Sequence, residues 1–174
     1  MTNLERALMV AEKAHAGQSY DIYPYMYHVK QVVRIATQLG YDESILVSCA
    51  LHDTLEDTEL SYNDIKKAFG EEVAEIVYAV TDELGRNRDE RKRNTYPKIR
   101  DNWKATVVKI CDRIANMQQS LEYNSRLFKM YQEENETFCS YLMSKHHPHI
   151  ETNKAWVKLN TMVKNQNEKP KQNM

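Results

Sequence analysis

The residues best suited to chemistry follow one apolar segment. Residues 45–51 are mostly apolar, and they run directly into His52, Asp53, Glu56 and Asp57. Charged groups beside a core cost free energy unless they are paired, solvated or bound to a metal. Adjacent imidazole and carboxylate groups on a helix can both reach an ion beside it, with the next two carboxylates close enough to hold a water. The alternative interpretation is a polar helix end that leads into a turn.

Two further residues are candidates for the same site. His28 lies near the start of a helix expected over residues 24–39, and Asp112 lies in one expected over 103–121. A single histidine among apolar neighbours is more often packed in a core than bound to a metal, so His28 matters only together with partners. A helical bundle can bring ligands from several helices to one centre. Two imidazoles and two carboxylates suit Mn²⁺ or Fe²⁺, and also Zn²⁺ or Co²⁺.

The elements that must position these residues are helices. The chain of 174 residues has only four Gly and four Pro, and its apolar residues recur at helical spacing. We expect one domain over residues 1–164 and a polar, disordered tail over 165–174. The expected helices cover residues 3–16, 24–39, 43–54, 61–69, 71–84, 103–121, 126–144 and 150–163.

Composition limits the possible function classes. Charged residues make up 28% of the chain and the net charge is −1, which does not favour a dedicated nucleic-acid-binding protein. Its apolar runs are too short to cross a membrane, and the first residues are not typical of a secretory signal peptide. The three cysteines are scattered in apolar surroundings, which predicts reduced core thiols in a cytoplasmic protein. The sequence does not indicate an oligomeric state.

Residues 85–100 are unusually basic, with seven Lys or Arg residues. A solvated helix or a mobile loop is the interpretation that we favour for this segment. A cationic rim that binds a phosphorylated small molecule is the functional alternative, because Arg and Lys pair well with phosphate oxygens.

Several segments together resemble one enzyme family. The order His, His-Asp, Asp is similar to that of the HD-domain metal-dependent phosphohydrolases. Residues 51–58 read LHDTLEDT, which resembles the LHDxxEDT signature of the RelA/SpoT-type alarmone hydrolases, and residues 109–117 read KICDRIANM, which resembles their KLADRLHNM segment. Residues 14–18 and 24–28 resemble the segments that precede and carry the first ligand. The resemblance covers roughly residues 4–145.

The resemblance implies an all-α fold, a single HD-domain helical bundle with a divalent metal, typically Mn²⁺, bound between helices. It implies that the metal ligands are His28, His52, Asp53 and Asp112. Glu56 and Asp57 would orient or deprotonate the attacking water. Asn116 would contact a small phosphorylated nucleotide, with Lys109 and Arg113 as further substrate-binding residues.

The reaction that this family implies is release of pyrophosphate from the ribose 3′ position of (p)ppGpp or a related alarmone. A 5′-nucleotidase-like phosphomonoesterase and a nucleotide-binding regulatory module without turnover are the alternatives. The family's basic Arg-Lys pair, which packs on the guanine base, has no counterpart between Gln18 and His28. Tyr20 and Tyr23 are the side chains in this interval that we expect to stack on a base.

Overall fold

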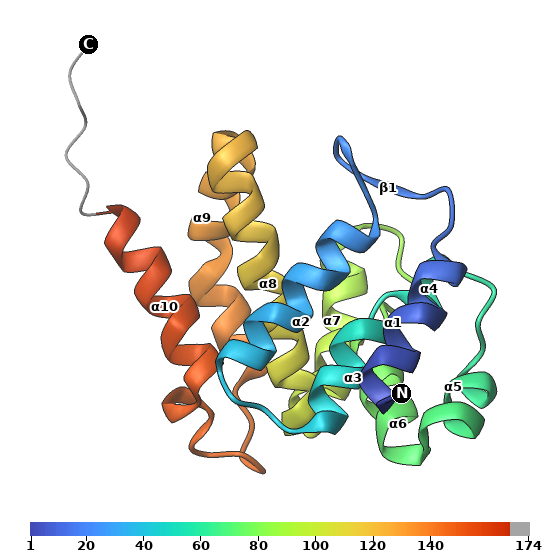
Figure 1. Ribbon diagram of the computed structural model, residues 1–174. Helices are drawn as coiled ribbons and strands as arrows, with labels where there is room; N and C mark the ends of the chain where they lie inside the picture. Colours follow the sequence, from blue (N-terminus) through green and yellow to red (C-terminus); the bar gives the residue numbers. More distant parts are fainter. Residues whose placement is uncertain (168–174) are drawn as a thin grey trace.

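A computed structural model describes residues 1–167 (Figure 1). The described residues are mostly helical, as the sequence predicts, but Pro24, expected at the start of a helix, belongs to a short hairpin and the helix begins at Met26. The helices are α1 (Asn3–Ala14), α2 (Met26–Gln38), α3 (Glu43–Leu51), α4 (Thr54–Asp57), α5 (Tyr62–Phe69), α6 (Glu71–Val80), α7 (Arg88–Asp101), α8 (Trp103–Tyr123), α9 (Ser125–Leu142), the 3₁₀ helix η1 (Ile150–Thr152) and α10 (Lys154–Asn167). Strands β1 (Ser19–Tyr20) and β2 (Tyr23–Pro24) form the antiparallel hairpin.

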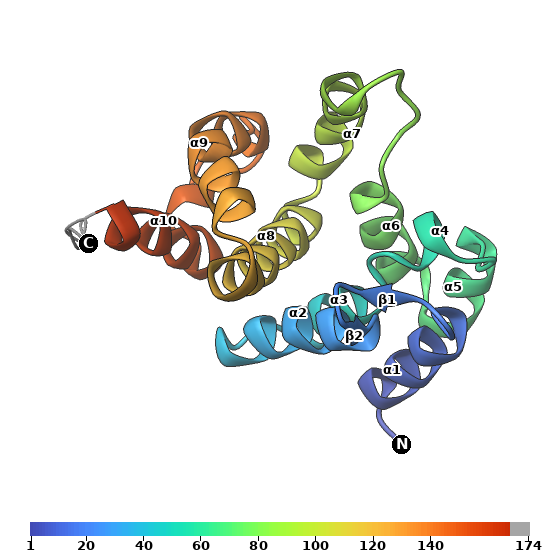
Figure 2. The same ribbon diagram turned by 90° about the horizontal axis from the view of Figure 1, so that it is seen from above.

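Helix α8 lies in the middle of the bundle. It packs against α2, α3, α6, α7, α9 and α10, and Figure 2 shows these helices arranged around it. The side chains of Val107, Ile110, Cys111 and Ile114 have no solvent exposure. Because α8 is buried on most sides, a polar side chain that faces inward must pair with another group or bind a ligand. Asp112 is such a buried side chain.

Capping residues that can be recognised in the sequence lie at the start of several of these helices. The Asp42 carboxylate accepts a hydrogen bond from the Ile45 N–H at the start of α3. Ser61 and Asp64 form the capping box expected of an Ser-x-x-Asp sequence at the start of α5. Asn87 caps α7 by accepting from the Glu90 N–H. The basic segment is therefore an ordered helix, and Thr95, Tyr96 and Ile99 are buried on its inner side.

Three further expected boundaries differ from the structure. The helix expected over 43–54 ends at Leu51, and a separate turn of helix, α4, begins after Asp53. Helix α6 ends at Val80, and Leu84, which we expected on its buried face, is almost fully exposed. Helix α10 continues to Asn167, so the first three residues of the expected tail are helical, and residues 168–174 lie outside the described part of the chain.

The remaining composition-based predictions concern membranes and cysteines. Among residues 1–167, every helix is too short or too polar to cross a membrane. Cys49 and Cys111 are buried and Cys139 is half-buried, and all three thiols are free. The expectation of reduced thiols in apolar surroundings agrees with this arrangement.

Candidate metal centre

Side chains from α2, the α3–α4 junction and α8 converge on one point. Nε2 of His28 lies 3.3 Å from Nε2 of His52 and 3.2 Å from Oδ1 of Asp112. Nε2 of His52 lies 2.8 Å from Oδ2 of Asp53 and 3.9 Å from Oδ1 of Asp112. Oδ2 of Asp53 is 3.8 Å from Nε2 of His28. The four residues that sequence analysis assigns as ligands are thus brought together.

The donor set fits a divalent metal ion. Two ligands at right angles around an ion, each about 2.1 Å from it, lie about 3 Å apart. Three of the separations, 2.8, 3.2 and 3.3 Å, are close to this value. Nδ1 of His52 donates to the backbone carbonyl of Cys49 at 2.9 Å, so in the neutral ring the lone pair would be on Nε2, which faces the cluster. A hydrogen bond of this kind on the remote ring nitrogen is usual for a metal-ligating histidine.

The junction between α3 and α4 carries two of the candidate ligands. His52 is the C-terminal cap of α3 and Asp53 is the N-terminal cap of α4. The carbonyl oxygen of Asp53 accepts from the N–H groups of Glu56 and Asp57, which closes the short turn. Both residues keep right-handed helical backbone angles, so their side chains point roughly 100° apart, and the imidazole and the carboxylate both reach the cluster beside the helix.

The carboxylates of the cluster favour a positive charge beside them. Burial alone would lower the pKa of His52, but the Asp53 and Asp112 carboxylates outweigh this and raise it to about 9. Burial would raise the pKa of Asp112, yet Lys109 and His28 hold it well below its usual range. Both carboxylates therefore remain ionised, and the cluster attracts a cation, which is either a proton on an imidazole or a metal ion.

Tyr25 is a member of the site that the sequence analysis did not single out. Its hydroxyl donates to Oδ2 of Asp53 at 2.5 Å and lies 3.4 Å from Oδ2 of Asp57. Its ring stacks on the buried His15 at a centroid distance of 4.5 Å. Burial and the nearby Asp53 carboxylate raise the pKa of Tyr25, so the phenol stays a donor. The sequence signal was its place one helical turn before His28.

The hairpin places Tyr20 over the cluster. The Tyr20 ring stacks on His28 at 4.6 Å, and its hydroxyl donates to Oδ1 of Asn116 at 2.6 Å. The Asn116 amide in turn donates to Oδ1 of Asp112 at 2.6 Å. Asp21 at the tip of the hairpin has φ of 56°, a conformation that Asp tolerates better than most residues. Tyr20 and Asn116 therefore connect the hairpin to a candidate ligand.

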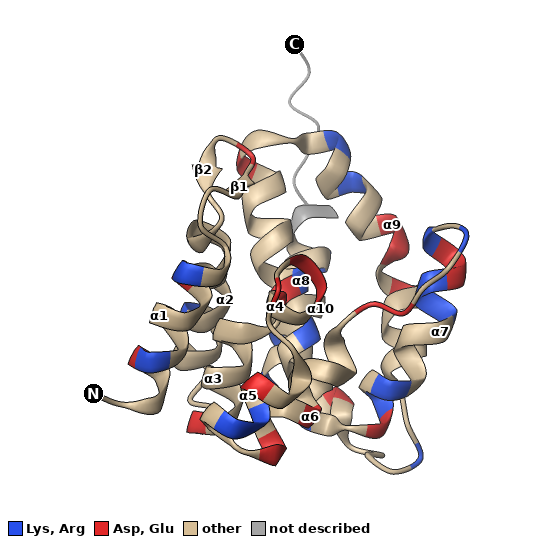
Figure 3. Cartoon of the chain, turned by 90° about the vertical axis from the view of Figure 1, so that its right-hand side faces the viewer, with Lys and Arg blue, Asp and Glu red and all other residues tan. Residues whose placement is uncertain are grey.

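Glu56 and Asp57 border the cluster from α4. Oε2 of Glu56 accepts from the N–H of Asp82 at 3.1 Å, which fixes the carboxylate beside the start of the α6–α7 connection. Desolvation raises the pKa of Glu56 and of Asp57. Both side chains still have exposed surface, so solvent water can reach them. Figure 3 shows these acidic residues of α4 at the centre of one face of the molecule.

The remaining candidate residues take different positions. Nζ of Lys109 lies 3.4 Å from Oδ2 of Asp112, on the side of the cluster toward α7. The Arg113 guanidinium is sandwiched between the rings of Tyr131 and Phe138 of α9, at 4.6 and 4.3 Å. Arg113 is thus directed away from the four candidate ligands.

Tyr23 also faces away from the centre of the cluster. Its ring stacks on Tyr27 at 4.4 Å, and its hydroxyl lies 3.0 Å from that of Tyr123 at the end of α8. Of the two tyrosines expected to stack on a base, Tyr20 is the one that contacts the candidate ligands.

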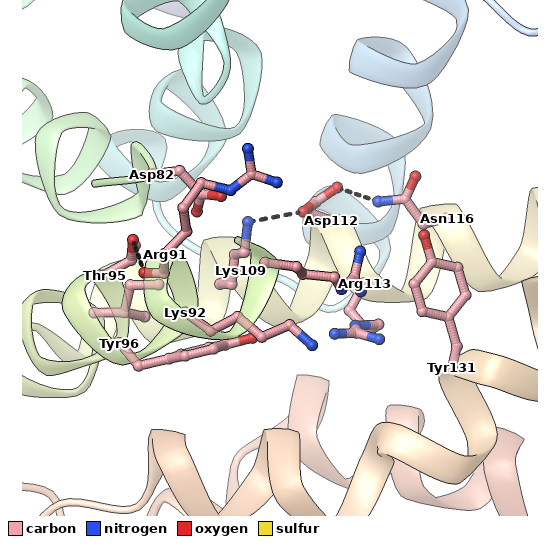
Figure 4. Close-up of a pocket in the computed structure, with 12 residues that line it drawn as sticks. Asp82, Arg91, Lys92, Thr95, Tyr96, Lys109, Asp112, Arg113, Asn116 and Tyr131 are labelled. Atoms are coloured by element: carbon pink, nitrogen blue, oxygen red, sulfur yellow. Dashed lines mark hydrogen bonds and ion pairs between the residues drawn. The ribbon is translucent and has the colours of Figure 1, made fainter. Parts of the chain in front are cut away.

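A pocket of about 160 Å³ adjoins the cluster between α7, α8 and α9 (Figure 4). Asp112 and Asn116 form one wall, and the basic side chains of α7 form the opposite one. Its basic lining residues are Arg88, Arg91, Lys92, Lys109 and Arg113, and its acidic ones are Asp82 and Asp112. This arrangement gives the pocket next to the cluster an excess of positive charge.

Comparisons with known proteins agree with this geometry. The chain matches the model of the HD domain over residues 7–139. It is 34% identical over 134 residues to a GTP pyrophosphokinase of Streptomyces coelicolor, an alignment that covers 72% of this chain and 16% of that protein. It is 34% identical over 104 residues to guanosine-3′,5′-bis(diphosphate) 3′-pyrophosphohydrolase MESH1 of Drosophila melanogaster, covering 56% of this chain and 58% of that protein.

Two solved structures share the architecture. A metazoan ortholog of SpoT that hydrolyzes ppGpp superposes with a TM-score of 0.77 at 24% identity, over 95% of this chain and 96% of that one. A structure from Listeria monocytogenes superposes with a TM-score of 0.63 at 27% identity, over 81% and 94%. The chain spans about a sixth of the Streptomyces relative and just over half of the Drosophila one. The family match covers most of the chain, and its helical bundle carries the His and Asp residues at one centre, so the chain belongs to the HD-domain family.

Proposed function

We propose that this chain is a metal-dependent nucleotide phosphohydrolase that releases pyrophosphate from the 3′ position of a guanosine bis(diphosphate) alarmone. The observation that carries the proposal is the convergence of His28, His52, Asp53 and Asp112, with Glu56 and Asp57 beside them. A structural metal site does not require two additional carboxylates at its solvent side. In a hydrolytic site such carboxylates have a role, because they can hold and deprotonate the attacking water.

Mn²⁺ is the ion that we propose for this site. The four residues supply two imidazole nitrogens and two carboxylate oxygens. This mixed set suits Mn²⁺, whereas softer metals are favoured by thiolate ligands. When bound, a divalent ion lowers the pKa of a coordinated water and offsets negative charge on the phosphorus. The chain holds both imidazoles by burial and His52 also by the Cys49 carbonyl, and it holds Asp53 through the Tyr25 hydroxyl.

Glu56 and Asp57 are the proposed proton acceptors. Their raised pKa values make them stronger bases than ordinary surface carboxylates, which favours removal of a proton from an attacking water. The hydrogen bond from the Asp82 N–H orients Glu56, and the Tyr25 hydroxyl lies beside Asp57. Of the two, Glu56 has the more firmly defined position, so we assign the main acceptor role to it.

The substrate is proposed from the pocket and from the relatives. The excess of basic side chains opposite Asp112 suits a ligand that carries several phosphate oxygens. Lys109 lies where it can pair with the reacting phosphate, and Asn116 and Tyr20 lie where they can contact the sugar or base. Relatives named as guanosine-3′,5′-bis(diphosphate) 3′-pyrophosphohydrolases support the alarmone as the nucleotide. We propose no nucleic-acid partner.

A product assay tests this proposal. The Mn²⁺-loaded protein would be incubated separately with ppGpp, pppGpp, ppApp, NADPH and nucleoside monophosphates, with pyrophosphate and orthophosphate measured apart. We expect pyrophosphate from the alarmones. Orthophosphate from a monophosphate would instead support the phosphomonoesterase. Tight nucleotide binding without product would support the regulatory module.

A further inference from the structure

Glu134 of α9 occupies an unusual place behind the basic wall of the pocket. Its Oε2 atom lies 3.0 Å from the Arg88 guanidinium, 3.1 Å from Nζ of Lys92 and 3.5 Å from the Arg113 guanidinium. One carboxylate oxygen is therefore shared by three cations that line the pocket. Glu134 itself does not line this pocket but lines a groove on the other side of Lys92.

The three cations differ in how firmly the rest of the fold holds them. Arg113 is 8% exposed and is clamped between two aromatic rings, so its position does not depend on Glu134. The Arg88 side chain is 50% exposed and that of Lys92 is 22% exposed. Long exposed side chains gain little from single ion pairs, but a shared carboxylate both gathers them and offsets part of their charge.

We propose that Glu134 is a positioning residue that sets how many phosphate charges the pocket accepts. Its negative charge offsets part of the positive charge of Arg88, Lys92 and Arg113, so that the pocket discriminates against the most highly phosphorylated ligands. The inference rests on the proposed function in one respect, namely that the ligand of this pocket is a phosphate group of a nucleotide. Glu134 acts through its partners and does not touch the ligand.

The first test is a titration of the full chain with inorganic orthophosphate, pyrophosphate and tripolyphosphate, in metal-stripped and Mn²⁺-loaded forms at constant ionic strength. Glu134→Gln keeps an oxygen that accepts hydrogen bonds and removes the charge. We expect it to bind tripolyphosphate about three- to tenfold more tightly, since a unit charge across a surface pocket is worth roughly such a factor. The affinity for orthophosphate should change by less than about twofold.

Glu133→Gln is the matched control. Glu133 precedes Glu134 on the same helix, is 67% exposed, and pairs with Lys129 at 3.7 Å. It therefore makes the same change in net charge without touching the pocket cations, and tripolyphosphate affinity should stay at the wild-type value. An equal gain in both variants would mean that only the net charge of the protein matters, and would overturn the proposal.

Further variants test whether the effect comes from the charge of Glu134 and acts through Arg88. Glu134→Asp keeps the charge and should retain wild-type selectivity. Arg88→Gln should weaken tripolyphosphate binding, and combining it with Glu134→Gln should cancel much of the gain of the single variant. With a hydrolysed nucleotide, Glu134→Gln should lower KM for the longer phosphate chain and leave kcat within about twofold.

The results distinguish this inference from the proposed hydrolysis. Unchanged or weaker tripolyphosphate binding in a folded Glu134→Gln variant would reject the role of Glu134, whatever the enzyme hydrolyses. The opposite result is also informative. If no nucleotide of the panel were hydrolysed but Glu134→Gln bound tripolyphosphate more tightly as expected, the proposed reaction would be rejected and the role of Glu134 would be supported.

Discussion

The metal cluster and the basic pocket share Asp112, but they are held by different forces. In the cluster, His28 and His52 are almost fully buried and are positioned by α2, α3 and α8, which pack closely on one another. In the pocket, Arg88 and Lys92 of α7 are gathered mainly by the Glu134 carboxylate. Core packing holds side chains in defined rotamers with few voids, whereas surface ion pairs are screened by salt and loosely fixed.

This contrast has a functional consequence. Chemistry at the cluster should depend on individual atoms and respond little to ionic strength. Capture of the substrate in the pocket should depend on summed charge and respond strongly to salt. Figure 3 shows the acidic turn α4 that borders the cluster and the charged helix α7, and Figure 4 shows the side chains that line the pocket.

The largest effect should come from Asp53→Ala. It removes a candidate ligand that contacts both His52 and Tyr25. We expect loss of stoichiometric Mn²⁺ and a fall in kcat of roughly 10³-fold or more, because several kcal/mol of charge stabilisation disappear. Metal analysis and pyrophosphate release would measure this, with circular dichroism as the check on folding. A variant that kept bound Mn²⁺ would remove Asp53 from the ligand set.

Glu56→Ala should come next. The side chain borders the cluster without belonging to it, so Mn²⁺ binding should remain while kcat falls by about 10²–10⁴-fold. Calorimetric titration with Mn²⁺ and steady-state kinetics would separate the two effects. Glu59→Ala, an exposed acidic residue just beyond α4, is the control and should behave as wild type. Full turnover in Glu56→Ala would exclude Glu56 as the proton acceptor.

Removal of the metal should lower the free energy of unfolding of the protein. Binding to the native state alone stabilises it by about 2.7 kcal/mol when the free ion is at 100 times its Kd. We expect Mn²⁺ to raise Tm of the wild-type chain in a concentration-dependent manner, and chelation to reverse the shift. The Asp53→Ala variant should show no such shift. Equal Tm shifts in both proteins would place the stabilising ion elsewhere.

A smaller effect is expected for Tyr25→Phe. The change removes the hydroxyl that donates to Asp53 and leaves the ring stacked on His15. Loss of a hydrogen bond to a ligand typically weakens metal binding by about 10- to 100-fold. Tyr27→Phe is the control, because Tyr27 stacks on Tyr23 and should not affect the metal. Wild-type Mn²⁺ affinity in Tyr25→Phe would show that packing alone orients Asp53.

The smallest effect belongs to the pocket. Arg88→Gln should raise KM about two- to fivefold and leave kcat nearly unchanged, since a half-exposed side chain contributes mostly long-range attraction. The rise should shrink as salt is added, because exposed charges are screened. If kcat fell as much as it does in Glu56→Ala, the distinction between the two regions would fail.

Much of the fold follows from local patterns. Helical spacing of apolar residues, the Asp42 and Ser61 caps and the scarcity of Gly and Pro predict the all-α architecture and most helix positions. Amphipathic spacing fails where a helix stops without a change in pattern. Leu84 continues the apolar stripe of α6, but the helix has already ended at Val80, so Leu84 is exposed.

Side-chain direction was harder to predict than side-chain identity. Lys109 and Arg113 occupy one stripe of α8, yet Lys109 turns to Asp112 whereas Arg113 turns to the aromatic rings of α9. Tyr20 and Tyr23 flank a two-residue turn, yet one contacts His28 and the other contacts Tyr123. Which neighbour a long side chain meets depends on helices distant in sequence, so local spacing cannot decide it.

The helices and the types and order of the candidate ligands could be predicted from the sequence, because local spacing and short motifs indicate both. The packing of α2, α3 and α8 is what brings His52 and Asp53 together with His28 and Asp112. Only the tertiary structure decided that Tyr25 supports Asp53, and that Glu134 gathers cations from α7 and α8. These relations depend on groups dozens of residues apart, and they exist only once core packing has fixed the distances between helices.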